Sequence, residues 1–417
     1  MQRLAALRSH LAAEPASAGD SRSIEWSGSN GTVVLRPRPG GVTPDDIIMG
    51  CGPLSSRSGP PEQLDAAVHA ALSAGIVRFD SAPLCECSRL PLRLLPSLKK
   101  TAAQTATRRT ASGAASPPRR WAARPSSTPK CVASAALAQP ASSPVPSLPQ
   151  AGKYIRWKRG SKISGAITPW DPFTVPIEER VVVPDYSRQG AHQSFQESME
   201  RMGGLDGVHT LRLHDPDSIE GGMEAAVSAD GLITGLRELR EQGKIEQVSF
   251  GMNANVDHKV ITPNAGGAET TAWTPAMIID MIRAVPEGTF DSCLLAYGWN
   301  LIGQDAWPVM EECAKHGIKV HVAGAMQALF TPRANAGSAP VTQTEAELQA
   351  KVDQWRELAE TFGVSLGAVA INFAALPSVV DKVVIGMRHE DEVTMNVKCM
   401  EEEVPAGAFS RLSRPLY

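Results

Sequence analysis

Several side chains that can exchange protons or bind a charged ligand directly follow short apolar runs of this sequence. An acid, Asp80, ends one such run, and a histidine, His214, ends another. Carboxyl and imidazole groups are common general acids and bases, whereas amides and guanidinium groups bind polar or anionic parts of a ligand. The candidate site residues at or after the ends of these apolar runs are Asp80, His214, Asn253, Trp299, Gly386, Arg388 and Asn396.

The elements that carry these residues alternate between short apolar strands and amphipathic helices. The strands are unbroken apolar runs, as expected for parallel strands that are buried on both faces. The helices have apolar residues spaced by three and four, and several end at a glycine. The predicted strands are Ile47–Cys51, Val77–Phe79, Gly207–Leu213, Gln247–Gly251, Cys293–Tyr297, Ile318–Ala323 and Val383–Gly386. The predicted helices are Glu62–Ser73, Ala191–Met202, Gly231–Gln242, Pro275–Ala284, Asp305–Lys315, Glu345–Phe362 and Asp391–Met400.

This order predicts an α/β protein with a (β/α)8 TIM barrel. Seven strand–helix units are visible, and the place of an eighth, third in order, is taken by a basic insert at residues 87–150. No GxGxxG follows any strand, which argues against a doubly wound dinucleotide-binding sheet. In a barrel, the residues that follow the strands meet at one end, so the candidate residues should meet there too.

The charge of the chain is unevenly distributed. The 417 residues contain 41 basic and 44 acidic side chains, for a net charge of −3, yet residues 87–170 contain no acid at all. Within them, residues 101–150 have no Ile, Phe, Tyr or Met and no apolar period, so they could form little core. We therefore expect a polar N-terminal extension (1–44), a first part of the barrel (45–86), a low-complexity basic insert that is disordered (87–150), and a second part of the barrel (151–417). The insert would disrupt the third βα unit and leave two strand edges unpaired.

The motifs at the strand ends, taken in order, resemble the aldo-keto reductase superfamily. The first is FDSAP at 79–83, the second is the stretch 185–217 that ends in HDPD, and the third is VVIGMRHEDEVTMNV at 383–397. The form HDPD is most similar to the aldose 1-dehydrogenase branch, which includes D-threo-aldose and L-galactose dehydrogenases. The resemblance covers about residues 47–84 and 151–400.

The resemblance implies an enzyme that uses NADP or NAD and transfers a hydride between nicotinamide and the anomeric carbon of a sugar. Asp80 and His214 would be catalytic, and Asn253 would hold the carboxamide of the cofactor. Trp299 would stack on the nicotinamide ring, although a core tryptophan is the alternative. At the adenosine end, Gly386 would allow close approach, and Arg388 with Asn396 would reach the phosphate, which favours NADP.

The sequence departs from the resembled pattern at two catalytic positions. The family uses a Tyr two residues after the proline of its FDTAP motif, and Cys85 stands there. The family Lys ends strand three as Thr-Lys-x-Gly, and the aligned residue is Gln150. Residues 145–150 (VPSLPQ) are what a pyrimidine-rich tract ending in CAG would encode, so one hypothesis is that an intron or a frame-shifted segment is translated here.

Three functions therefore remain open at this point. The chain is an aldose dehydrogenase impaired at the third βα unit, a non-catalytic nucleotide-binding barrel that acts as a sensor or partner subunit, or a barrel enzyme with other chemistry. We expect a small sugar or carbonyl substrate, no metal, no nucleic acid and no membrane span. The seven cysteines are an odd number and are scattered along the chain, which fits a reducing compartment, so we expect a cytoplasmic protein. Organelle targeting by the Arg-bearing N-terminus stays open. The oligomeric state is not predicted.

Overall fold

The computed structural model describes part of the chain, and every structural statement below refers to that part. The described residues are 26–27, 33–54, 60–81, 130–135, 154–157, 180–201, 207–218, 221–254, 258–262, 268–272, 274–326, 329 and 345–410.

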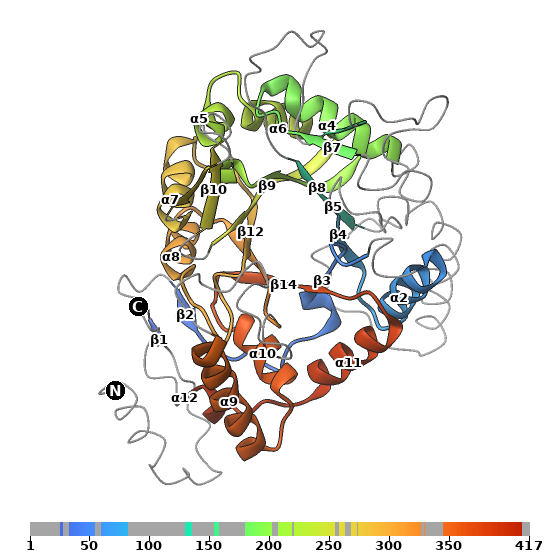
Figure 1. Ribbon diagram of the computed structural model, residues 1–417, viewed down its shortest axis with the longest axis vertical. Helices are drawn as coiled ribbons and strands as arrows, with labels where there is room; N and C mark the ends of the chain where they lie inside the picture. The colour runs from blue at the N-terminus through green and yellow to red at the C-terminus, as the bar shows by residue number, and fades with distance from the viewer. Residues whose placement is uncertain are drawn as a thin grey trace, which may run out of the picture.

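Eight parallel strands close into a barrel, which Figure 1 shows from one end. In chain order they are β3 (Ile47–Gly50), β4 (Arg78–Ser81), β5 (Lys130–Ala135), β8 (Val208–His214), β9 (Ile245–Asn253), β12 (Ser292–Ala296), β13 (Lys319–Ala323) and β14 (Val380–Gly386). Each strand pairs with the next one in the chain, and β14 pairs with β3 to close the ring. The predicted (β/α)8 barrel is confirmed.

Helices surround the barrel (Figure 1). They are α2 (Pro61–Ser73), α4 (Arg188–Arg201), α5 (Gly222–Val227), α6 (Leu232–Glu241), α7 (Thr274–Ala284), α8 (Trp307–Lys315), α9 (Glu345–Phe362), α10 (Leu366–Ala374), α11 (Glu390–Glu401) and α12 (Gly407–Ser410). Helix α6 illustrates why they form. Its buried Leu232, Leu236 and Leu239 recur at the spacing of one helix face, while Glu241 is exposed, so the helix covers the barrel with one apolar stripe.

The third strand of the barrel lies inside the segment that we expected to disrupt it. Strand β5 pairs with β4 on one side and with β8 on the other, inside the segment 87–150 that we predicted to be a disordered insert. The prediction of a barrel with a missing strand and two open edges is therefore wrong. The reason is that a strand paired on both sides is held by backbone hydrogen bonds to distant residues, which a local apolar pattern does not report. The hypothesis of a translated intron did not predict a barrel strand here, and the other residues of 87–150 lie outside the described ranges.

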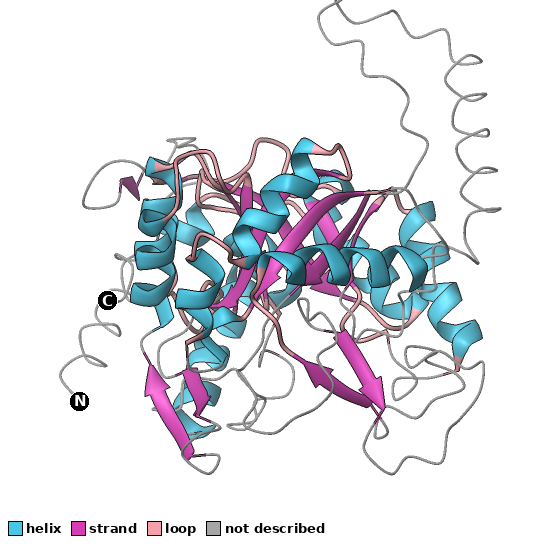
Figure 2. Cartoon of the chain, turned by 90° about the horizontal axis from the view of Figure 1, so that it is seen from above, coloured by secondary structure: helices cyan, strands magenta, loops and turns pink. Residues whose placement is uncertain are grey.

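Short antiparallel ribbons decorate the barrel. Ribbon β6–β7 (Tyr154–Trp157 with Arg180–Val183) follows the carboxyl end of β5, and ribbon β10–β11 (His258–Thr262 with Ala268–Ala272) follows that of β9. Both ribbons protrude beyond the same end of the barrel in Figure 2. The chain thus has additional structure at the end where a barrel places its active site.

The predicted N-terminal extension is partly packed against the rest of the molecule. Strand β2 (Val34–Leu35) pairs with β1 (Trp26–Ser27), and Val33 and Val42 are buried. The backbone amide of Arg36 also donates to the carbonyl oxygen of Leu376. Val33, Leu35 and Val42 are therefore part of the core, although we expected a polar extension over 1–44.

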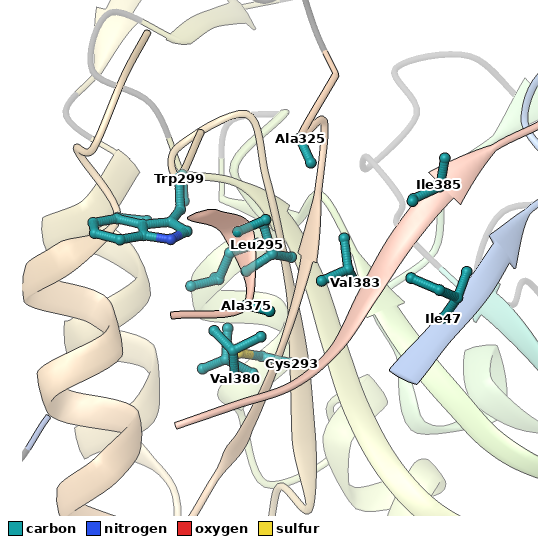
Figure 3. Packing of buried hydrophobic residues seen from close by; sticks show 14 of the residues in the cluster. Ile47, Cys293, Leu295, Trp299, Ala325, Ala375, Val380, Val383 and Ile385 are labelled. Atoms are coloured by element: carbon teal, nitrogen blue, oxygen red, sulfur yellow. The ribbon is translucent and has the colours of Figure 1, made fainter. Parts of the chain in front are cut away.

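The buried apolar side chains form one continuous cluster between the strands and the helices. Figure 3 shows part of it, with Ile47 of β3, Leu295 of β12 and Val383 of β14 at or near zero exposure. This packing fixes the ends of the strands in space, so residues carried there are held on a rigid frame. Among the described residues, no helix is both long and apolar enough to span a membrane.

Candidate functional site

Three of the site residues predicted from the sequence lie at the carboxyl ends of barrel strands β4, β8 and β9. Asp80 is the next-to-last residue of β4, His214 ends β8, and Asn253 ends β9. Their strands, together with β5 between β4 and β8, make up half of the barrel. The structure therefore brings these three residues to the same mouth.

The carboxyl group of Asp80 is nearly buried at this mouth, with 9% exposure. Burial raises its pKa, because a charged carboxylate loses its hydration, while Arg212 and His214 act in the opposite direction. His214 is more accessible, with 37% of its side chain exposed, and its Nδ1 lies 3.0 Å from Oδ2 of Asp215. A half-exposed imidazole beside a carboxylate can exchange a proton with a ligand in the mouth.

Two residues at the mouth have left-handed backbones. Asp215 follows β8 with a φ of 45°, and Tyr297 follows β12 with a φ of 64°. Such conformations are costly for residues other than glycine and cluster at functional sites. Burial and the charge of Asp215 raise the pKa of Tyr297, so its phenol stays protonated at neutral pH. Sequence reasoning placed Tyr297 in a strand and missed its position at the mouth.

A buried arginine lies directly beneath this site. Arg212 is two residues before His214 in β8, so both side chains leave the same face of the strand. It is fully buried, and its Nε donates to Oδ2 of Asp80 over 3.1 Å. Sequence reasoning treated residues 207–213 as an apolar strand and missed Arg212. The signal was a charged residue in a buried strand, two positions before a candidate catalytic residue.

The predicted cofactor residues of the last βα unit border a hollow of about 350 Å³ between β14 and α11. Gly386 and Asn396 both line it. A Cβ built on Gly386 would come within 2.7 Å of Cγ of Pro53, so the backbone here is closely approached and only glycine fits without movement.

The polar side chains near this hollow differ in how free they are. Arg388 is exposed, its Nε donates to Oε1 of Glu392 over 2.8 Å, and its two Nη nitrogens have no partner among the described residues. Asn396 is buried, and its Nδ2 donates to the carbonyl oxygen of Glu392. Arg388 can therefore still bind an anion, whereas part of the hydrogen-bonding capacity of Asn396 is already used within α11. A phosphate group fits this chemistry.

Trp299 is not at the mouth. Its indole is 1% exposed and stacks on Phe373 of α10, with ring centroids 5.1 Å apart. The ring of Trp307, in α8, lies 5.5 Å away. Figure 3 shows the ring beside a helix, away from β14 and β3. The prediction that Trp299 stacks on nicotinamide is corrected, since no face of this ring is open to a ligand and the alternative of a core residue accounts for its position.

The two catalytic positions that depart from the resembled pattern, Cys85 and Gln150, lie outside the described residues. Strand β5 begins at Lys130, at the end opposite the mouth, and finishes at Ala135, so no lysine ends this strand. The alignment that placed the end of strand three at Gln150 is therefore wrong. In the described part of the chain, no group of three or more His, Cys, Asp or Glu side chains could hold a metal ion.

Known proteins were compared with this chain. The family model described as the aldo/keto reductase family matches residues 173–414, which is more than half of the chain. A D-threo-aldose 1-dehydrogenase from a Pseudomonas species is 26% identical over 270 residues, covering 63% of this chain and 72% of that protein. A pyridoxal 4-dehydrogenase from Microbacterium luteolum is 24% identical over 237 residues, covering 55% of this chain and 62% of that protein, so the chain spans less than two thirds of its length.

Solved structures give a weaker likeness. A crystal structure assigned to the aldo-keto reductases, from Pseudomonas aeruginosa, superposes with a TM-score of 0.46 at 12% identity, covering 93% of this chain and 96% of that chain. A likeness of this size adds nothing to the fold already described. The extent of the family match, together with the closed barrel, leads to one conclusion: the chain belongs to the aldo/keto reductase family.

Proposed function

We propose that the chain binds NADP or NAD and transfers a hydride between nicotinamide and the anomeric carbon of an aldose. The proposal is supported by the family, whose members generally use NAD(P)H and act on small carbonyl compounds. The observation that carries it is the convergence of Asp80, His214 and Asn253 on one mouth of the barrel. The aldose is proposed from the likeness to D-threo-aldose 1-dehydrogenase.

Each residue has a proposed role. His214 orients the substrate oxygen and exchanges a proton with it, because its imidazole is accessible and held by Asp215. Asp80 supplies a fixed charge at the floor of the mouth. Asn253, which has no hydrogen bond from its side chain to another described residue, is available to hold the carboxamide. When bound, the nicotinamide ring supplies or takes up the hydride.

The adenosine end of the cofactor is proposed to lie at the hollow beside α11. Arg388 would bind the 2′-phosphate of NADP through its free Nη nitrogens, and Gly386 would let the backbone approach. Replacing Arg388 with Ala should weaken NADPH binding about tenfold, the size of one charge-assisted contact, and leave NADH binding nearly unchanged. Equal losses for the two cofactors would place the 2′-phosphate elsewhere.

A non-catalytic nucleotide-binding barrel is the second candidate, and a specific observation favours it. Cys85 stands where the resembled pattern has its Tyr, and β5, the third strand of the barrel, ends at Ala135 without a lysine. A thiol is shorter than a phenol, and geometry decides whether a general acid can reach its substrate. We therefore expect cofactor binding with very low turnover.

The experiment is a titration of the full chain with NADPH and NADH by fluorescence, followed by turnover assays on a panel of aldoses with pyridoxal as a comparison. Cofactor binding with turnover of an aldose supports the dehydrogenase. Binding without turnover, in the wild type and in Cys85→Tyr, supports the sensor or partner subunit. Absence of binding to either cofactor contradicts both. Sequencing the mature transcript tests the translated-intron hypothesis separately, since a message that holds codons 87–150 in frame contradicts it.

A further inference from the structure

Arg212 is a charge in a place that barrels usually fill with branched apolar side chains. Its side chain is 0% exposed, and it points into the barrel below His214. A buried charge without partners is strongly unfavourable, so its contacts must account for its presence.

Each of the three guanidinium nitrogens of Arg212 has a partner. Nε donates to Oδ2 of Asp80 over 3.1 Å, and Nη1 donates to Oγ of Ser249 over 2.5 Å. Nη2 lies 2.7 Å from Nδ1 of His321. These partners come from β4, β9 and β13, so the planar guanidinium is fixed by three strands at once.

His321 continues this network across the barrel. To accept from Arg212, its Nδ1 must carry no proton, which leaves the proton on Nε2, 3.6 Å from Oδ2 of Asp381. Burial lowers the pKa of His321 to about 4, and the charge of Arg212 adds to this effect. His321 is therefore neutral at physiological pH, and its unprotonated Nδ1 can accept a hydrogen bond from Arg212.

Asp80 depends on Arg212 for its charge. It is almost buried, and among the described residues Arg212 is the cation that bonds to it. His214 is the other group that favours the ionised form, acting without a direct bond. In the resembled pattern the Asp holds a catalytic lysine, and β5 ends at Ala135 with none.

We propose that Arg212 is the positioning residue of Asp80, holding its carboxylate ionised and directed at the barrel mouth in place of a lysine. The inference rests on the proposed function, because Asp80 belongs to that site. A guanidinium does not lose its proton in proteins, whereas a lysine can. The ion pair of Asp80 and Arg212 therefore supplies no proton, and the proton of any reaction comes from another group at the mouth.

The test measures the protonation of Asp80 directly in the full chain, by infrared or carbon NMR spectra of protein with labelled aspartate, assigned by Asp80→Asn. In the wild type the Asp80 carboxyl is ionised at neutral pH. In Arg212→Met its proton affinity rises by at least about tenfold, because burial is no longer opposed by a bonded cation. Arg212→Lys restores the charge and lowers the proton affinity again.

A control variant removes a more exposed ion pair elsewhere. Arg240 donates to Oδ2 of Asp291 over 2.9 Å near the opposite end of the barrel, and Arg240→Met should leave the Asp80 signal unchanged. A merely structural role for Arg212 would lower stability in both variants without moving the Asp80 signal. An Asp80 that is equally ionised in Arg212→Met and in the wild type overturns the proposal.

Two further measurements keep the proposal testable if Arg212→Met does not fold. Arg212→Gln keeps a hydrogen-bond donor without charge and should show the same rise in proton affinity. In the wild type itself, a protonated Asp80 at neutral pH overturns the proposal outright. The NADPH titration tests the proposed function separately: a chain that binds no nicotinamide cofactor contradicts that function while the Asp80 measurement stands on its own.

Discussion

His321 should make the stability of the barrel depend on pH in a defined range. Burial lowers its pKa from 6.5 to about 4, the hydrogen bond with Asp381 opposes this, and the charges of Arg212 and Lys382 add to it. The imidazole of the unfolded chain therefore takes up its proton near pH 6.5, and that of the folded chain near pH 4. Between these values the unfolded chain holds more protons, so the free energy of unfolding falls as the pH falls.

The size of the effect follows from the two pKa values. At 1.36 kcal/mol per pKa unit, the interval between 6.5 and about 4 corresponds to roughly 3 kcal/mol, lost completely only below the folded-state value. About 2 kcal/mol of this is lost between pH 7.5 and pH 5. A loss of this size is a substantial part of the stability of an ordinary domain.

The variant His321→Gln isolates this contribution. Glutamine offers an acceptor to Arg212 and a donor to Asp381, but it does not titrate. Urea unfolding near pH 7.5 and near pH 5 should show that the wild type loses about 2 kcal/mol more than the variant. His69→Gln, at an exposed position in α2, is the control and should behave as the wild type. Equal losses in the wild type and His321→Gln would refute the reasoning.

Three further substitutions test other parts of the structure. Trp299→Ala should lower the free energy of unfolding by about 3–5 kcal/mol in urea and leave NADPH affinity unchanged, because the ring is a core element; weaker NADPH binding at unchanged stability would restore the stacking role. Glu312 has its pKa lowered to about 2, mainly by a hydrogen bond from Arg283, so it stabilises the fold above pH 4.5 and ceases to as the pH falls through about 2. Glu312→Gln should therefore lower the free energy of unfolding by about 1–2 kcal/mol near pH 6, a figure reduced because solvent screens the exposed Arg283, and by much less near pH 2. A loss that does not change with pH would contradict this. Gly298→Ala should cost about 1–3 kcal/mol because its Cβ would lie 2.2 Å from a backbone oxygen, whereas Gly303→Ala, with 3.9 Å of space, should be nearly neutral; similar melting temperatures for the two would contradict it.

Much of the barrel could be predicted because its elements have local signatures. The helix predicted at Glu62–Ser73 is α2 at Pro61–Ser73, and the long helix predicted at Glu345–Phe362 is α9 with the same bounds. Helix α10 was missed because all of its residues are buried, so it has no polar face and no amphipathic period. Strand β5 was missed because its pairing partners, not its composition, hold it in place.

The candidate site was predictable only in part for the same reason. The rule that barrels place chemistry at the carboxyl ends of their strands was enough to select Asp80, His214 and Asn253. It could not distinguish Trp299 from Tyr297, two residues apart, because the turn after β12 decides which one faces the mouth.

The order of strands and helices, the residues at the strand ends and the family resemblance were all determined by the sequence alone, because they depend on near neighbours in the chain. The presence of a third strand and the pairing of Asp80 with Arg212, 132 positions away, were decided only by the tertiary structure. Closing the barrel brings side chains of β4, β9 and β13 around the one buried charge of Arg212 on β8. Since a buried charge must find its partners wherever the fold supplies them, the electrostatics of this site belong to the closed barrel and to no single segment.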